Sequence, residues 1–190
     1  MLYPILATLH WTPRVRSIER TLRQLDGMNT GTHRMVDVGC GPGWLSRLAA
    51  SLQYRYLGVD PAARRSKLLS GGRIEPLDAD AVQQELQPTD ILVLNGVAHH
   101  LDDETLQGLL NAARRCTALL ICDHRTEQAN HALNRLLQRY DRGKYIRPLT
   151  FFSHLQGYST MHLDPFEIKW LGLPVWSYFT GLYRPDRSES

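Results

Sequence analysis

Five short apolar runs, each followed by a stretch with helical spacing, dominate the chain and strongly constrain its fold. The runs cover residues 34–38, 54–60, 73–78, 90–96 and 117–123. Strands that alternate with helices predict a parallel, doubly wound α/β sheet with right-handed crossovers and helices on both faces. The helices are expected over residues 44–52, 62–69, 79–86, 102–115 and 126–140.

The two ends of the chain depart from this alternation. Thr12 and Pro13 are typical of a helix start, and Gly27 is a suitable end for that helix. Two strand-like runs, 161–171 and 175–184, predict an antiparallel hairpin at the sheet's end. We therefore expect one domain over residues 1–190. It comprises an N-terminal helical lid (1–30), a ligand-binding core (33–123) and an acceptor-side helix, loop and hairpin (124–190).

Composition narrows the class of protein. The 190 residues are 43% hydrophobic and 22% charged, which is ordinary for a soluble domain. The net charge of +3 comes without a long basic run, so a nucleic-acid partner is not indicated. The three cysteines form no CxxC pair, which argues against a disulfide framework or a zinc site. The apolar N-terminus is too short to span a membrane, so we expect a cytoplasmic protein. The oligomeric state stays open.

Ligands of a doubly wound sheet bind at the carboxyl ends of its strands. The first strand ends in a loop with Gly39, Gly41 and Gly43, where the backbone is able to turn sharply and approach a ligand closely. The spacing is GxGxG, with Trp44 after it, and not the GxGxxG of diphosphate-binding loops. A tight turn without a ligand is the alternative interpretation of these glycines.

The second strand ends at Asp60, 21 positions after Gly39. A carboxylate has two acceptor oxygens, so at this place it suits the two hydroxyls of a ribose. The alternative is an N-cap for a helix that begins at Pro61. The glycine loop and Asp60 together favour a nucleoside-containing ligand more strongly than either does alone.

At this point the sequence resembles the class I S-adenosylmethionine-dependent methyltransferases. The resemblance rests on four stretches in the family's order: VDVGCGPGW (36–44), YLGVDPA (56–62), LDAD (77–80) and TDILVLNGVAHHLDDE (89–104). It implies a Rossmann-like seven-stranded sheet of order 3-2-1-4-5-7-6 with only strand 7 antiparallel. It also implies S-adenosyl-L-methionine as cofactor and S-adenosyl-L-homocysteine as product.

The resemblance further implies the positions that hold the cofactor. The three glycines would pass under its methionine part, and Asp37 would hold the amino end or the loop itself. Asp60 would bind the ribose, Asp78 with Ala79 would lie near the adenine, and Asn95 with Gly96 would flank the cofactor after the fourth strand. Cys40 and Pro61 belong to the same cofactor-binding segments.

Histidines follow two strands at the edge where the ligand is expected. His99 and His100 lie between the fourth strand and its helix, and His124 follows the fifth. A histidine titrates near neutral pH, so each is a candidate to remove a proton from an acceptor hydroxyl. The alternative is that they pack and hydrogen-bond the loops. Asp123 with His99 and His124 could also be a metal cluster, but no ligand spacing supports it, and no metal site is predicted.

Missing motifs narrow the choice of acceptor. The chain lacks the D/N-P-P-Y motif of nucleic-acid amino methylation, the cysteine nucleophile near a proline of cytosine-C5 methylation, and the paired-glutamate loop of arginine methylation. A small-molecule acceptor is therefore favoured, with O-methylation first and C- or N-methylation open. The alternatives are an RNA- or protein-directed methyltransferase and a binding protein without catalysis. Two interpretations are open for a loop run of basic and aromatic residues: a binding site for an anionic acceptor, or a solvated loop. The run comprises Arg142, Lys144, Tyr145 and Arg147.

Overall fold

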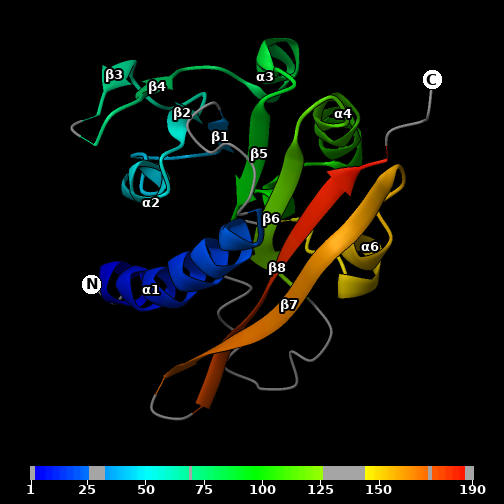
Figure 1. The fold of residues 1–190 in the computed structure, drawn as a ribbon. Helices are drawn as coiled ribbons and strands as arrows, with labels where there is room; N and C mark the ends of the chain where they lie inside the picture. The colour runs from blue at the N-terminus through cyan, green and yellow to red at the C-terminus, as the bar shows by residue number, and fades with distance from the viewer. Residues whose placement is uncertain (1–2, 26–32, 69, 126–143, 171–172, 187–190) are drawn as a thin grey trace.

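The computed structural model describes residues 3–25, 33–68, 70–125, 144–170 and 173–186 (Figure 1). Their elements follow one another along the chain as α1 (Tyr3–Leu22), η1 (Arg23–Leu25), β1 (Arg34–Val38), α2 (Ser46–Ser51), β2 (Arg55–Val59), β3 (Ser66–Lys67), β4 (Arg73–Glu75), α3 (Ala79–Glu85), β5 (Asp90–Asn95), η3 (Ala98–His100), α4 (Asp103–Ala113), β6 (Ala118–His124), α6 (Leu149–Ser153), β7 (Tyr158–Trp170) and β8 (Leu173–Pro185).

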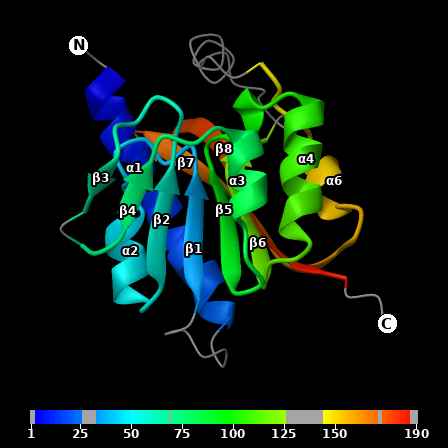
Figure 2. The same cartoon turned by 90° about the horizontal axis from the view of Figure 1, so that it is seen from above.

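The strands form one sheet in the order β3-β4-β2-β1-β5-β6-β8-β7. β4, β2, β1, β5 and β6 pair in parallel and stand side by side in Figure 2. β8 is antiparallel to both β6 and β7, so β7 runs in the direction of the parallel strands. The Rossmann-like α/β fold is therefore confirmed, including the antiparallel β8 and the predicted C-terminal hairpin. The strand count differs from the predicted seven because β3 adds an eighth.

The helix predicted over residues 62–69 is wrong. This segment holds β3, which pairs antiparallel with β4. Gly71 and Gly72 have positive φ values of 84° and 93°, and Leu68 N–H donates to Gly72 carbonyl oxygen at 3.1 Å. The two glycines thus turn the chain back on itself to make a hairpin, whereas the sequence pattern assigned them to a helix end.

The parallel strands are buried on both faces by two separate clusters. On one face α3, α4 and α6 pack against side chains such as Val36 and Leu92. On the other face α1 and α2 pack against Met35 and Ile91. Figure 1 shows α1 and α2 on the opposite side of the sheet from α4 and α6. This two-sided burial explains why the strands read as continuous apolar runs.

Some of the observed helices agree with the sequence prediction and others differ from it. α3 and α4 are confirmed, with Asp78 and Asp102 as their N-caps. α1 begins at Tyr3 instead of Thr12, with Pro13 inside the helix. A proline removes one N–H donor from a helix, and here the helix continues through that loss. The helix predicted over 126–140 lies outside the described residues. In the part of the chain that the structure describes, no helix is long and apolar enough to cross a membrane.

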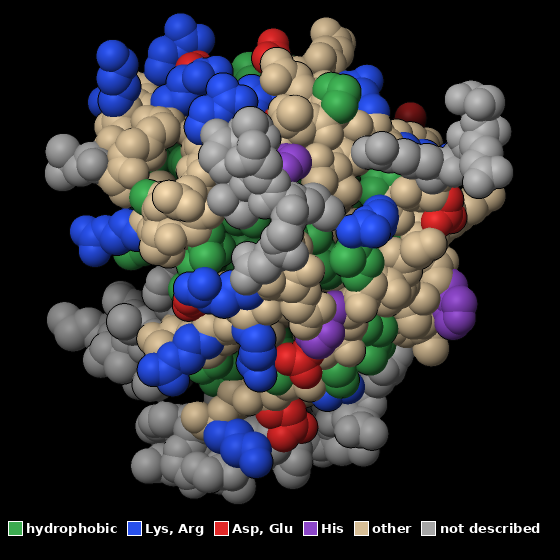
Figure 3. Space-filling model, viewed as in Figure 1, with side chains coloured by type: hydrophobic (Ala, Val, Ile, Leu, Met, Phe, Trp, Pro, Cys, Tyr) green, Lys and Arg blue, Asp and Glu red, His purple; other side chains and the backbone are tan. Residues whose placement is uncertain are grey.

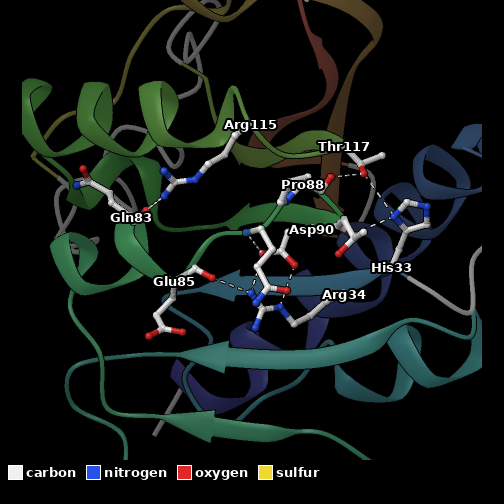
Figure 4. Close-up of polar contacts among 10 residues, drawn as sticks. His33, Arg34, Gln83, Glu85, Pro88, Asp90, Arg115 and Thr117 are labelled. Carbon is white, nitrogen blue, oxygen red and sulfur yellow. Dashed lines mark hydrogen bonds and ion pairs between the residues drawn. The ribbon is translucent and has the colours of Figure 1, made fainter.

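A polar network ties the strands together away from the glycine loop (Figure 4). Arg34, the first residue of β1, donates to both carboxylate oxygens of Asp90, the first residue of β5, at 2.9 and 2.7 Å. Arg34 also donates to the carbonyl of Glu85 at 2.9 Å, and Asp90 accepts from the N–H of Gln87. These bonds fix the amino ends of β1 and β5, and so the register at which their carboxyl ends present the loops of the site.

Candidate active site

The loop after β1 contains glycines whose lack of a side chain lets its backbone lie close to the loop after β5. Gly39 has a φ of 67°, and a Cβ built on it would lie 2.6 Å from Cγ2 of Val97. Gly41 has a φ of 52°, and a Cβ there would meet nothing within 4 Å. Gly39 is thus required for packing between the β1 and β5 loops, while Gly41 borders open space. Gly43 also has a positive φ, of 80°.

Asp60 closes the opposite side of this open space. Its Oδ2 accepts the N–H of Gly41 at 3.0 Å, and its Oδ1 accepts the N–H of Ala62 at 2.9 Å. The carboxylate is therefore held against the glycine loop with acceptor capacity left on each oxygen. Pro61, which follows it, is exposed.

A pocket of about 460 Å³ lies beside Asp60. Gly41 and Asp60 are the two predicted site residues among its lining. The other lining residues are Pro42, Ala62, Ala63, Arg64, Ser66, Leu68 and Ile74. Sequence reasoning missed most of these because residues 62–69 were assigned to a helix. A hairpin signal was present in Gly71 and Gly72.

The predicted adenine neighbours do not line this pocket. Asp78 is exposed, and its Oδ1 accepts the N–H of Ala81 at 2.9 Å as the N-cap of α3. Ala79 is the first residue of that helix. Helix capping alone accounts for an aspartate at 78 followed by an alanine at 79. The contact of these two residues with an adenine stays a prediction.

Asp37 and Cys40 are buried beneath the loop. Asp37 is 2% exposed and accepts a hydrogen bond from the Tyr56 hydroxyl at 2.7 Å. Burial raises the pKa of Asp37 to about 7, although the Tyr56 hydrogen bond and Arg14 act in the other direction. Burial likewise raises the pKa of the Cys40 thiol to about 12, with Asp37 and Asp60 adding to the effect. Cys40 is therefore a neutral packing residue, and a Cβ on Gly58 would lie 2.7 Å from its sulfur.

Asn95 and Gly96 lie at the carboxyl end of β5. The side-chain oxygen of Asn95 accepts a hydrogen bond from Nη2 of Arg14, which comes from α1. Gly96 has a φ of 68°, and its N–H donates to the carbonyl of Cys122 at 2.8 Å. Arg14 was not among the predicted site residues, because its contact with Asn95 joins positions 81 residues apart.

A buried histidine–carboxylate pair stands at the ends of β5 and β6. Nδ1 of His99 lies 2.5 Å from Oδ1 of Asp123, and the His99 backbone N–H donates to Oδ2 at 3.0 Å. Burial alone would raise the pKa of Asp123, but the hydrogen bond from His99 and the two nearby histidines lower it below its usual range. The ionised Asp123 thus holds a proton on Nδ1 and leaves Nε2 as the basic nitrogen of His99.

The three predicted histidines take different positions. His99 and His124 are both 4% exposed, and their rings meet edge to face at 4.8 Å. Nε2 of His124 lies 3.0 Å from the Tyr178 hydroxyl. His100 is exposed, with its ring centroid 4.1 Å from that of His99. His99 therefore combines a place on this edge with direct orientation by the Asp123 carboxylate.

The same cluster has the composition of a metal site. The donor atoms of His99, Asp123 and His124 lie within 4.8 Å of one another. Asp123, however, already accepts hydrogen bonds from the His99 ring, the His99 N–H and the His124 N–H, the last at 2.7 Å. Oδ1 accepts two of these bonds, from the His99 ring and the His124 N–H, so both of its acceptor positions are taken and Asp123 is directed at His99. This geometry favours an oriented base over a metal centre.

Arg147 has a structural role, which is neither of the two roles considered for this run, a contact with an anionic acceptor and a solvated loop. Its Nη2 lies 2.6 Å from Oδ1 of Asp103, and Nη1 donates to the carbonyl of Ala98 at 2.8 Å. Nη2 also donates to the carbonyl of Leu101 at 2.9 Å. These bonds occupy the guanidinium and hold the loop that carries His99. Lys144 and Tyr145 are exposed, and Arg142 lies outside the described residues.

Comparisons with known proteins agree with this fold. A family model described as "Methyltransferase domain" matches residues 10–162. The plantazolicin methyltransferase BamL is 14% identical with a TM-score of 0.66, over 92% of this chain and 85% of BamL. Magnesium protoporphyrin IX methyltransferase from Synechocystis PCC 6803 is 14% identical with a TM-score of 0.63, over 90% and 81% of the two chains.

A methyltransferase from Archaeoglobus fulgidus is 16% identical with a TM-score of 0.61, over 90% of this chain and 94% of the other. At these identities the structures establish a shared fold. No curated protein sequence matches the chain.

Proposed function

The chain belongs to the methyltransferase-domain family and is an S-adenosylmethionine-dependent methyltransferase, and from this premise we propose that it methylates a hydroxyl group of a small molecule. The observation that carries the finer proposal is the buried His99–Asp123 pair, at 2.5 Å, on the edge of the sheet that also carries the glycine loop. Acceptors that lose a proton on methylation are those that need such a base.

The residues on this edge fit the cofactor. The pocket beside Asp60 has a carboxylate at one wall and open backbone at Gly41, which suits a nucleoside with two ribose hydroxyls. Asp37 would face the amino end from beneath the loop. Asp78 with Ala79, and Asn95 with Gly96, would complete the cradle. Cys40 and Pro61 would contribute through the loops that they shape.

When bound, S-adenosylmethionine supplies a methyl group that its sulfonium already makes electrophilic. The chain's own residues then have three tasks: to hold the acceptor in line, to exclude water and to remove a proton. We assign the last task to Nε2 of His99, which would take the proton of the acceptor hydroxyl. Asp123 would keep the imidazole in the correct tautomer and stabilise its cationic form.

Two observations support a small acceptor over a nucleic acid. The exposed basic residues Arg64, Arg65, Lys67 and Arg73 belong to the β3–β4 end of the sheet, where Lys and Arg side chains gather in Figure 3. This is the proposed nucleoside end and not the end with His99, and Glu75 pairs with two of these arginines. In addition, the similar structures include methyltransferases named for plantazolicin and magnesium protoporphyrin IX.

The test is transfer of labelled methyl from S-adenosylmethionine to a panel of phenols and alcohols, with their amine analogues as paired substrates. The proposal expects product with hydroxyl acceptors and a loss of turnover in His99→Gln that is larger for hydroxyls than for amines. Equal losses for both acceptor types would contradict the assigned base. Labelling of an RNA pool in preference to every small acceptor would favour the alternative class of substrate.

A further inference from the structure

Arg14 brings a cation from α1 to the carboxyl ends of the central strands. Its Nη2 donates to the side-chain oxygen of Asn95 at the end of β5. Its guanidinium carbon lies 5.1 Å from the centroid of the Tyr178 ring on β8. Residues far apart in the sequence thus seat one guanidinium at the edge of the sheet that carries the proposed site.

The guanidinium of Arg14 occupies space that is open only because residue 96 is a glycine. A Cβ built on Gly96 would lie 2.5 Å from Nη2 of Arg14. The next residue, Val97, packs against Gly39 of the glycine loop, so that a Cβ on Gly39 would clash with it at 2.6 Å. Arg14 therefore adjoins the glycine loop through the two contacts that Gly96 and Gly39 make possible.

Arg14 differs from the two buried arginines in its charge environment. Arg34 is paired with Asp90 at 2.7 Å, and Arg147 with Asp103 at 2.6 Å. Within the described residues, Arg14 has no carboxylate within ion-pair distance, and its buried Nε has no hydrogen-bond partner. A guanidinium is always charged and presents its donors in a planar fork that fits a carboxylate. Its guanidinium contacts the Asn95 amide oxygen and the Tyr178 ring, and it also forms a hydrogen bond with the Cys122 side chain. Asp37 and Asp123 act on this charge electrostatically, but from beyond ion-pair distance.

We infer that Arg14 binds the carboxylate at the methionine end of the cofactor. This inference rests on the proposed function. The strand order β2-β1-β5 leads from Asp60, through the glycine loop, to Asn95 and Arg14. A ligand whose nucleoside lies at Asp60 and whose chain crosses the glycine loop reaches Arg14 with its amino-acid end. That end carries an ammonium and a carboxylate, and Asp37 and Arg14 supply the complementary charges.

Two other roles for Arg14 are distinguishable from this one. Arg14 could serve only to hold Asn95 and α1 in place, or it could bind a carboxylate of the acceptor. A structural role would affect every ligand of the pocket alike, whereas an acceptor-binding role would leave cofactor affinity unchanged. The discriminating probes are therefore two ligands that share the adenosine group and differ in the amino-acid end.

The experiment is calorimetric titration of the full chain with S-adenosylhomocysteine and with 5′-methylthioadenosine, which lacks the amino-acid end. We expect Arg14→Gln to weaken S-adenosylhomocysteine at least about tenfold, as loss of a charged hydrogen bond predicts. Its affinity for 5′-methylthioadenosine should be unchanged, which also shows that the variant is folded. Arg14→Lys should retain part of the discrimination. Arg16→Gln, an exposed arginine of the same helix, should alter neither affinity.

Equal weakening for the two ligands would overturn the inference in favour of a structural role. Undiminished affinity of Arg14→Gln for S-adenosylhomocysteine would overturn it as well. If the unsubstituted protein bound neither compound, the proposed function would fail, and the inference with it.

Discussion

At the scale of single residues, Asp37 is a carboxyl group whose burial opposes its ionisation. Its pKa of about 7 lies well above the usual 3.8 because burial outweighs the hydrogen bond from Tyr56. Folding therefore retains a proton that the unfolded chain releases, and the stability that this proton provides is lost as pH rises from about 4 through 7. A ligand ammonium group beside Asp37 would instead favour the ionised carboxylate and lower its pKa.

Asp37→Asn tests that statement. The variant should gain stability relative to the unsubstituted protein as pH rises from about 4 to 8, by about 4 kcal/mol at most. It should also lose cofactor affinity, since an amide cannot balance an ammonium. Urea unfolding at several pH values measures the first effect and calorimetry the second. A stability difference that does not change with pH would refute the raised pKa.

His99 is the predicted base because its ring is bonded to the carboxylate of Asp123. His99→Gln should reduce kcat with a hydroxyl acceptor by about 10²- to 10⁴-fold, the range of general-base catalysis, and should flatten the acidic limb of the pH–rate profile. Asp123→Asn should cause a smaller loss. The matched control is His154→Gln, an exposed histidine on the C-terminal side of α6. A normal kcat and pH profile in His99→Gln would remove His99 from the reaction.

The hydrogen bonds to Asp123 also predict the effect of metal removal. Because three donors already occupy this carboxylate, turnover should be the same before and after dialysis against a chelator. The measurement is kcat with and without chelator, followed by addition of divalent cations. Activity that disappears and returns with one of these ions would reassign the cluster as a metal centre.

At the scale of elements, α1 carries both core residues and a site residue. Ser17 donates to Thr180 of β8 at 2.9 Å, and Ile18 and Leu22 are fully buried. Arg14 lies one turn before Ser17, at the carboxyl edge of the sheet. The second half of α1 thus anchors the helix. That the residues before it cover the proposed site, as the lid at residues 1–30, stays a prediction.

Deletion of residues 1–12 separates these roles. The truncated protein should stay folded because Ile18, Leu22 and Leu25 remain in the core. Cofactor affinity and turnover should both fall, since the helical turns that position Arg14 are lost. Thermal unfolding checks the first expectation, and calorimetry with an activity assay checks the second. Unchanged affinity together with unchanged turnover would show that the N-terminal segment is no lid.

At the scale of the whole molecule, regular patterns were predictable and contacts between distant segments were not. The apolar runs predicted the parallel strands because a strand that is buried on both faces needs apolar side chains at successive positions. The position of Asp60 against Gly41 followed from strand ends meeting at one edge. No sequence pattern predicted the contact of Arg14 with Asn95, since this contact depends on how α1 crosses the sheet.

The error at residues 62–69 has a different physical source. Helix-forming residues before Gly71 and Gly72 resemble a helix with its glycine end, yet the same two glycines also allow a tight turn with positive φ. Pairing with β4 selected the turn. Because of this error most of the residues that line the pocket were not predicted, since they belong to that hairpin and not to a helix.

The central claim is that S-adenosylmethionine binds at the glycine loop with its ribose on Asp60, and calorimetric titration tests it most directly. The account predicts saturable binding of one cofactor per chain. Asp60→Ala should weaken it by about tenfold or more, since a charged hydrogen-bond acceptor is lost. Asp80→Ala, an exposed carboxylate in α3, should bind normally. Absence of binding by the unsubstituted protein, or equal affinity in Asp60→Ala, would contradict the claim.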